Sequence, residues 1–198
     1  MLGHSTNILL KVLYLLMFWA RGHIFAPYLH LSHDELITKM KSKLGVKILM
    51  IKVLFICHGN ICRSTMAQSV MTYLAKEAGV EDKFYIESAA TSSEEIGNPP
   101  HPGTVAKLRQ EGIPVIPHRA VRMTRDDYDN YDYIICMDSE NVRNVQRLSE
   151  GDPEEKIYKL LTFAGSGMDV ADPWYTGDFE ATFRDVYAGC KGILEELL

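Results

Sequence analysis

The stretch Cys57-His58-Gly59-Asn60-Ile61-Cys62-Arg63-Ser64 lies between two apolar segments of different periodicity. Residues 53–56 before it read Val-Leu-Phe-Ile, which is typical of a buried parallel strand. After it, in residues 66–78, apolar side chains recur at the spacing of a helix. The stretch is therefore predicted to be a turn that joins a strand to the N-terminus of a helix.

The residue types in this turn point to phosphate chemistry. Backbone amides at a helix N-terminus converge on a position where an anion is favoured. Such amides, together with Arg63, would stabilise the thiolate of Cys57. They would also hold a bound phosphate, with the guanidinium contacting two of its oxygens. A nucleophile beneath a bound phosphate is the arrangement required for covalent phosphoryl transfer.

With these features, the turn resembles the phosphate-binding loop of the low-molecular-weight protein-tyrosine phosphatases. Three further segments carry the resemblance: Ser88-Ala89-Ala90-Thr91-Ser92, Gly97-Asn98-Pro99-Pro100 and Asp172-Pro173-Trp174-Tyr175. The likeness extends from about Lys52 to the C-terminus. It implies an enzyme that hydrolyses phosphotyrosine in protein substrates, or other aryl phosphate monoesters, through a phosphocysteine. Neither a cofactor nor a metal is expected, because Arg63 and the amides do what Mg²⁺ does elsewhere.

Cleavage of a phosphate ester needs a nucleophile, stabilisation of the phosphate oxygens and a proton for the leaving oxygen. Cys57 is the expected nucleophile, and Arg63 with the loop amides from His58 onward would stabilise the oxygens. Asp172 is the candidate acid, since aromatic residues follow its Asp-Pro turn. Taken without the loop, Asp172 could equally be a turn former. The resemblance points to the acid.

The resemblance also implies supporting roles around the loop. Ser88 and His118 would support it from behind, and Ser64 would donate a hydrogen bond to the departing thiolate. Asn60 is expected in a left-handed backbone conformation, which asparagine tolerates better than most residues. Cys57 and Cys62 are predicted to form a reversible disulfide under peroxide.

Two segments are expected to form the walls of the cleft. Trp174 and Tyr175 would line its entrance with aromatic faces. The long loop of residues 88–102 would form the other wall, as it does in the family. Glu94 lies in this loop where many relatives carry an aromatic residue, so substrate preference is not carried over in detail.

The pattern of elements predicts an α/β fold with three layers. Further strands are expected at residues 84–87, 133–137 and 157–161, with helices at 104–111, 140–148 and from 179 onward. Asp138 or Ser139 would cap the second of these helices. Because strands and helices alternate, the four strands should form a parallel sheet with helices on both faces and the phosphate-binding loop after the first strand. Ligands bind such sheets beyond the carboxyl ends of the strands, where Cys57 lies.

Composition limits the remaining possibilities. A net charge of −5 argues against a nucleic-acid partner. The four cysteines, at positions 57, 62, 136 and 190, are too few and too scattered for a secreted disulfide scaffold, and no C-x-x-C pair indicates zinc. Cys136 and Cys190 are expected in the core. The three arginines in residues 118–125 are expected in solvent, and the competing interpretation is a contact with the phosphorylated peptide. A cytoplasmic setting follows from the need to keep a reactive thiolate reduced.

Residues 1–49 lie outside the resemblance, so the chain divides into an N-terminal extension at 1–49 and a phosphatase domain at 50–198. The apolar run at residues 8–20 is shorter than the ~20 residues that span a bilayer and lacks signal-peptide features, so membrane contact is not expected. Residues 32–35 are predicted to cap a short helix that ends near Gly45. The extension could be a weak membrane-associating segment, a helical appendage, or a stretch upstream of the native start at Met50. The last is favoured because family members usually begin there.

Three alternative functions share parts of this pattern. An arsenate reductase on the same fold would need further redox cysteines near the third strand, and Cys136 has no such neighbour. A phosphoarginine phosphatase typically has a threonine where Ile61 stands. A non-catalytic phosphopeptide-binding module could lose Cys57 or Asp172, and both are present.

Overall fold

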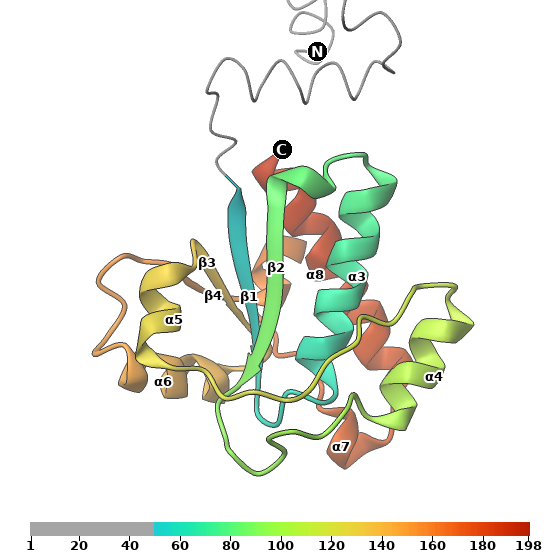
Figure 1. Ribbon diagram of the computed structural model, residues 1–198, viewed down its shortest axis with the longest axis horizontal. Helices are drawn as coiled ribbons and strands as arrows, with labels where there is room; N and C mark the ends of the chain where they lie inside the picture. Colours follow the sequence, from blue (N-terminus) through green and yellow to red (C-terminus); the bar gives the residue numbers. More distant parts are fainter. Residues whose placement is uncertain (1–49) are drawn as a thin grey trace, which may run out of the picture. The chain divides into compact units, whose positions relative to one another are not determined.

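The computed structural model describes residues 50–198, and their core is a four-stranded sheet. Its strands are β1 (Ile51–Cys57), β2 (Phe84–Ala90), β3 (Tyr133–Cys136) and β4 (Ile157–Lys159). All neighbours are parallel, in the order β2-β1-β3-β4. β1 is therefore central, with β2 on one side and β3 on the other (Figure 1).

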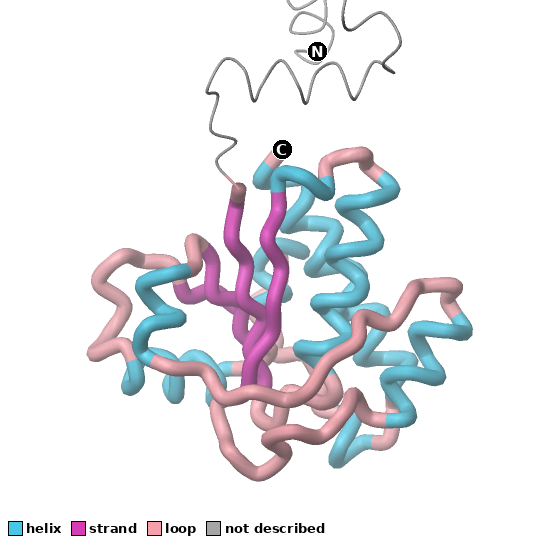
Figure 2. The backbone as a smooth tube through the Cα atoms, viewed as in Figure 1, coloured by secondary structure: helices cyan, strands magenta, loops and turns pink. Residues whose placement is uncertain are grey.

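Helices cover both faces of this sheet (Figure 2). The α-helices are α3 (Arg63–Glu77), α4 (Pro102–Gln110), α5 (Arg125–Asn130), α6 (Ser139–Leu148), α7 (Pro173–Thr176) and α8 (Phe179–Leu197). Two short 3₁₀ helices are η2 (Glu81–Lys83) and η3 (Leu160–Ala164). α3 and α8 pack on one face, and α5 and α6 lie on the other. The predicted three-layer α/β fold is confirmed.

The central strand shows why both faces must be covered. Side chains alternate along a strand, so Val53 and Phe55 face α3 and α8. Leu54 and Ile56 face the layer of α5 and α6. All four are at most 2% exposed. A strand that is apolar on both sides cannot leave either face in water.

The fourth strand was predicted too long. β4 ends at Lys159, and residues 160–164 form η3 instead. Among residues 50–198, β4 is an edge strand that pairs only with β3, so no second strand in this part of the chain extends it. Leu160 and Leu161 are buried among the residues packed with α8. A buried 3₁₀ turn and a buried strand both require apolar residues, so the sequence does not distinguish them at these positions.

Other boundaries differ by smaller amounts. β2 continues to Ala90, three residues beyond the prediction, because Ser88, Ala89 and Ala90 pair with β1 and are buried. β3 ends at Cys136 rather than Met137. α5 and α7 were not predicted from the sequence, and they have only six and four residues. Helices this short do not display a full apolar period.

The apolar run at residues 8–20 and the capping signal at residues 32–35 lie outside the described residues. Within residues 50–198, no helix is both long enough and apolar enough to cross a bilayer.

The predicted core cysteines, Cys136 and Cys190, are fully buried. The arginines at 119, 122 and 125 are exposed, as predicted.

Candidate active site

The turn between β1 and α3 holds its amides inward because its carbonyls are tied outward. Four backbone amides outside the turn donate to its carbonyl oxygens: Thr91 N to Cys57 O (2.9 Å), Ser92 N to His58 O (3.0 Å), His101 N to Ile61 O (2.7 Å) and Met66 N to Cys62 O (3.1 Å). The N–H of a trans peptide points opposite to its C=O. The amides that follow these carbonyls therefore point away from the outer segments, and the amide of Asn60 donates to the thiol of Cys57 at 3.2 Å.

Cys57 lies at the end of β1 and is 2% exposed. Its Sγ is 3.0 Å from Oγ of Ser64 and accepts a hydrogen bond from the amide of Asn60 at 3.2 Å. These contacts hold Sγ at the base of the turn, between a hydroxyl and a backbone amide.

Asn60 is the link between the turn and the sheet behind it. Its backbone has φ 57°, so it adopts the left-handed conformation that was predicted. Its amide nitrogen donates to Oγ of Ser64 and Oγ of Ser88, both at 2.9 Å. Its Oδ1 accepts from Nε2 of His118 at 2.6 Å and from the amide of Val121 at 3.0 Å. The structure thus gathers the three predicted supports, Ser64, Ser88 and His118, around one buried side chain.

The tautomer of His118 follows from this contact. Oδ1 of Asn60 has no proton to give, so Nε2 of His118 must donate. Burial lowers the pKa of His118, which keeps the imidazole neutral at neutral pH. Ser88 in turn donates to Oε1 of Gln68 at 2.7 Å, and Gln68 lies on α3. Gln68 was not identified from the sequence.

Arg63 is 3% exposed and is held by two carboxylates. Its Nη2 donates to Oδ2 of Asp172 and its Nη1 to Oδ2 of Asp138, each at 2.6 Å. Nη1 also donates to the carbonyl of Val170 at 3.2 Å. Burial alone would lower the pKa of Arg63, but Cys57, Asp172 and Asp138 together raise it above its ordinary value. The guanidinium is therefore charged and fixed in position.

Nε of Arg63 differs from the other guanidinium nitrogens. It is buried and has no hydrogen-bond partner among the described residues. An unsatisfied buried donor costs about 1–3 kcal/mol, so a partner is expected from outside the chain. An oxygen of a bound phosphate would supply one.

The contact of Asp138 with Arg63 was missed in the sequence analysis. Asp138 was identified only as a possible helix cap, and its Oδ1 does accept from the amide of Asn141 at 2.6 Å, at the start of α6. Its other oxygen holds Arg63. A usable signal existed, because Asp138 follows a strand whose carboxyl end lies at the same edge as Cys57.

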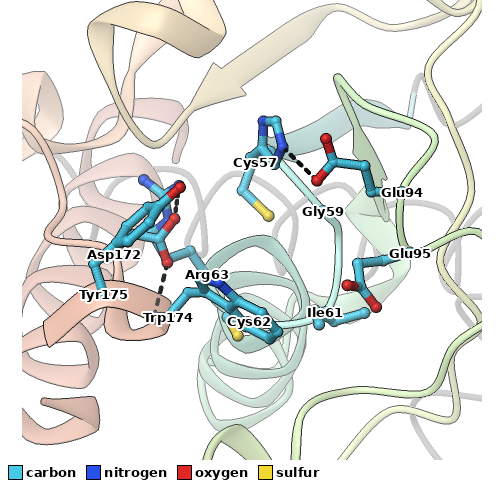
Figure 3. A pocket seen from close by; sticks show the side chains of 11 residues that line it. Cys57, Gly59, Ile61, Cys62, Arg63, Glu94, Glu95, Asp172, Trp174 and Tyr175 are labelled. Carbon is cyan, nitrogen blue, oxygen red and sulfur yellow. Dashed lines mark hydrogen bonds and ion pairs between the residues drawn. The ribbon is translucent and has the colours of Figure 1, made fainter. Parts of the chain in front are cut away.

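The pocket around Cys57 has two walls of different character (Figure 3). On one side, Asp172 caps α7 by accepting from the amide of Trp174 at 3.1 Å. Trp174 and Tyr175 follow it and are 58% and 84% exposed. The pocket encloses about 500 Å³, including space open to solvent. The aromatic pair thus lies at its entrance, as predicted.

The opposite wall is acidic. Glu94 lines the pocket and lies 3.2 Å from Nε2 of His58. Glu95 lines it too, and the sequence analysis did not identify it. Its carboxylate accepts from Asn98 at 2.7 Å. Nothing in the sequence distinguished Glu95 from any other polar residue of the long loop.

The second cysteine of the turn has a different environment from the first. Cys62 is 5% exposed and directly precedes α3. Burial, with smaller contributions from Cys57 and Asp172, raises the pKa of Cys62 to about 12. Cys62 therefore stays a neutral thiol at neutral pH. Ile61 beside it lines the pocket, and all four cysteines of the described residues are free.

We predict that Asn60→Ala lowers the free energy of unfolding by about 2–4 kcal/mol. The change leaves the buried Ser88 and the part-buried amide of Val121 without their partner and puts a Cβ-bearing residue without a polar side chain at positive φ. Urea unfolding measures the loss. Asn60→Gly is the matched control: it also loses the hydrogen bonds but tolerates φ 57°, so it should be about 1 kcal/mol more stable than the alanine variant. Equal stability of the two variants would contradict the backbone contribution.

Comparison with known proteins places this geometry in a family. Residues 52–198 match the family described as low molecular weight phosphotyrosine protein phosphatase. The chain is 40% identical over 150 residues to the low molecular weight protein-tyrosine-phosphatase YfkJ of Bacillus subtilis, covering 75% of this chain and 96% of that protein. It is also 40% identical over 149 residues to the low molecular weight phosphotyrosine protein phosphatase of Gallus gallus, covering 73% and 94%.

The fold agrees with these similarities. The crystal structure of YfkJ from Bacillus subtilis superposes with a TM-score of 0.72 and 41% identity, covering 75% of this chain and 94% of that one. The matched part begins at the second residue of β1 and includes every residue that lines the pocket described above.

Proposed function

The chain belongs to the low molecular weight phosphotyrosine protein phosphatases, and we propose that it hydrolyses phosphotyrosine in proteins through a phosphocysteine on Cys57. One observation carries this proposal: the thiol of Cys57, the guanidinium of Arg63 and the carboxylate of Asp172 line a single pocket. The three groups are a nucleophile, an anion holder and an acid. They are the set that phosphomonoester cleavage requires.

Arg63 would hold two oxygens of the phosphate. Nη1 is anchored by Asp138, which leaves Nε and Nη2 for the substrate. Nη2 now donates to Asp172, so phosphate binding would replace that contact with one to an oxygen. The carboxyl group of Asp172 is then released toward the leaving group. The inward amides of the turn would hold the remaining oxygens.

In the first step, the thiolate of Cys57 attacks phosphorus and the sulfur–phosphorus bond forms. The bond from phosphorus to the phenolic oxygen breaks, and its electron pair stays on that oxygen. The carboxylic acid of Asp172 gives its proton to the same oxygen, and tyrosine leaves. General acid catalysis of this kind contributes about 10²–10⁴-fold.

In the second step, the carboxylate of Asp172 takes a proton from water as the water oxygen attacks phosphorus. The sulfur–phosphorus bond breaks, its electron pair returns to Cys57, and inorganic phosphate is formed. Ser64 and the amide of Asn60 stabilise the departing thiolate through the contacts they already make with Sγ. Asp172 is again protonated, so the cycle closes.

The burial of the other cysteines supports hydrolysis over arsenate reduction. A reductase needs accessible thiols that exchange with the nucleophile. Cys136 lies in β3 and Cys190 in α8, both fully buried, and burial raises the pKa of each well above its ordinary value. Neither supplies a reactive thiolate.

The walls of the pocket support an aryl substrate. Cys57 is almost fully buried, so a phosphorylated side chain must be long to reach it. A phenyl ring beside Trp174 and Tyr175 gains about 0.5–1.5 kcal/mol beyond its buried area. Phosphoserine offers neither the length nor the ring. Phosphoarginine has the length, but Ile61 presents only apolar atoms to its guanidinium.

We predict that kcat/KM for a phosphotyrosine peptide exceeds those for matched phosphoserine and phosphoarginine peptides by at least about a hundredfold. Ile61→Thr should raise phosphoarginine turnover relative to phosphotyrosine by roughly tenfold. The variant keeps a branched side chain of similar bulk and adds a hydroxyl that can accept from the substrate guanidinium. Trp174→Ala is the complementary variant and should raise KM for phosphotyrosine by about 3–10-fold. Steady-state phosphate release measures all three. Equal rates for wild type on phosphoarginine and phosphotyrosine would refute the aryl preference but leave the phosphocysteine mechanism intact.

We propose that Cys62 protects Cys57 from irreversible oxidation, in the reducing setting of the cytoplasm. Peroxide would oxidise the Cys57 thiolate to a sulfenic acid and release water. The Cys62 sulfur would then attack that sulfur, forming the disulfide and a second water. Because the pKa of Cys62 is raised to about 12, this second step should be slow.

Mass spectrometry after mild peroxide should therefore detect a peptide bridged between Cys57 and Cys62, and dithiothreitol should restore activity. Cys62→Ser should instead accumulate the sulfinic acid of Cys57 and recover little activity. Recovery equal to that of wild type in this variant would show that Cys62 offers no protection.

A further inference from the structure

A second cavity opens beyond the carboxyl end of β2, on the side of the sheet that α5 and α6 cover. Its lining comes from three segments: Ala90 with Thr91, Arg122 with Met123, and the part of α6 around Asn144. It shares no residue with the pocket around Cys57. It encloses about 250 Å³, including space open to solvent.

Thr91 lines this cavity, and its hydroxyl is unsatisfied. Its Oγ1 is buried and has no hydrogen-bond partner among the described residues. Leaving such a group unpaired costs about 1–3 kcal/mol, so the hydroxyl favours any polar ligand that enters. The backbone amide of Thr91 is already used, since it donates to the carbonyl of Cys57 at 2.9 Å. Only the side chain is left for a ligand.

The other two polar side chains of the lining offer donors. Oδ1 of Asn144 accepts from Nη1 of Arg147 at 3.0 Å, which leaves the amide nitrogen of Asn144 to donate. Arg122 is exposed, and its guanidinium makes no hydrogen bond or ion pair with any residue in the described part of the chain. Within residues 50–198, no aspartate or glutamate lines the cavity. A lining that offers donors and one positive charge, without a carboxylate, suits an anion.

We propose that this cavity is a second binding site for a small tetrahedral oxyanion of the phosphate class. The hydroxyl of Thr91 and the amide of Asn144 would donate to oxygens inside the cavity, and the guanidinium of Arg122 would close over its mouth. The planar guanidinium can contact two oxygens at once. The phosphate could be free inorganic phosphate or a second phosphate group on the substrate protein.

The cavity is joined directly to the catalytic turn. The amides of Thr91 and Ser92 hold the carbonyls of Cys57 and His58, at 2.9 and 3.0 Å. On the other side, the segment that carries Arg122 pairs with Ala90 through a parallel bridge. The amide of Val121, in the same segment, donates to Oδ1 of Asn60. An anion bound between these two segments would therefore contact both segments that hydrogen-bond to the catalytic turn.

Titration of the ¹⁵N-labelled full chain with sodium sulfate, followed by nuclear magnetic resonance, tests the site without relying on turnover. Amides of the catalytic turn report the first site, and those of Thr91, Arg122 and Asn144 report the second. Two independent isotherms are expected, the second in the millimolar range. Arg122→Gln should weaken the second isotherm about tenfold, and Thr91→Val, which keeps the shape but removes the hydroxyl, should weaken it severalfold.

Arg143→Gln is the matched control for charge. Arg143 is exposed on α6 beside Asn144, does not line the cavity, and its loss changes the net charge equally. This variant should leave the second isotherm within about twofold of wild type. A second isotherm that Arg122→Gln leaves unchanged would overturn the proposal. So would shifts at residues 91, 122 and 144 that follow the isotherm of the catalytic turn.

Kinetics with peptides separate the two sources of phosphate. If the second phosphate belongs to the substrate, a doubly phosphorylated peptide should have a lower KM than its singly phosphorylated form, and Arg122→Gln should remove the difference. If the site takes free phosphate, both peptides should have the same KM while the sulfate isotherm persists. Both outcomes support the anion site and differ only in its source.

Discussion

Cys57→Ser is expected to lower kcat/KM for a phosphotyrosine peptide by roughly 10⁴–10⁶-fold, the usual consequence of removing a covalent nucleophile. A serine hydroxyl is not ionised at neutral pH and is a much weaker nucleophile than a thiolate. Within the described residues, the hydrogen-bond partners of Sγ are the hydroxyl of Ser64 and the amide of Asn60, and neither is a base that would take the proton of a serine. Turnover within about tenfold of wild type would refute the phosphocysteine mechanism.

This experiment needs evidence that the variant is folded and still binds. The hydroxyl of a serine can accept the hydrogen bond from the amide of Asn60, so the melting temperature should change little. Affinity for the phosphotyrosine peptide, measured by calorimetry, should stay within about tenfold because Arg63 and the turn amides remain. Rapid acid quench of the wild type should yield a phosphorylated peptide that contains Cys57, and the same peptide from the variant should carry no phosphate.

Asp172→Asn should lower kcat/KM by about 10²–10⁴-fold for phosphotyrosine and for aryl phosphates with poorly acidic phenols. Asparagine caps a helix as well as aspartate, so α7 and the aromatic wall should stay in place. It has no acidic proton to give to the leaving oxygen. The loss should shrink steadily as the leaving phenol becomes more acidic, since such phenolates leave without a proton.

The quantity compared must be kcat/KM, because it reports only the steps up to the first irreversible one. The value of kcat also contains the hydrolysis of the phosphocysteine, where Asp172 acts as a base. With an activated phenol, the variant should show a burst of phenol release followed by slow turnover. A loss in kcat/KM that is equal across all leaving groups would contradict the acid role.

The catalytic turn could be predicted because its determinants are contiguous. The apolar run of β1, the helical spacing of α3 and the residues between them fix a strand-to-helix turn. The left-handed residue at Asn60 was also predicted, because few residue types tolerate that conformation. Alternation of strands and helices was sufficient for the three layers and the parallel sheet.

The contacts of Arg63 are of a different kind. Asp138 is 75 residues away in sequence and Asp172 is 109 residues away, yet each lies 2.6 Å from the guanidinium. Asp138 reaches it because β3 lies beside β1 in the sheet order β2-β1-β3-β4. In a strand order that separated β3 from β1, the same Asp138 would only cap a helix.

The sequence therefore determined what depends on neighbouring residues: the turn, the cysteine at the end of β1, and the arginine that opens α3. Periodicity and turn chemistry act over a few residues, so they can be read directly from the chain. The tertiary structure determined the strand order, the second carboxylate on Arg63, the acidic wall at Glu95 and the cavity beside Thr91. These features depend on which distant segments pack together. Burial of apolar surface drives that packing, and no local sequence pattern shows which polar groups it will bring into contact.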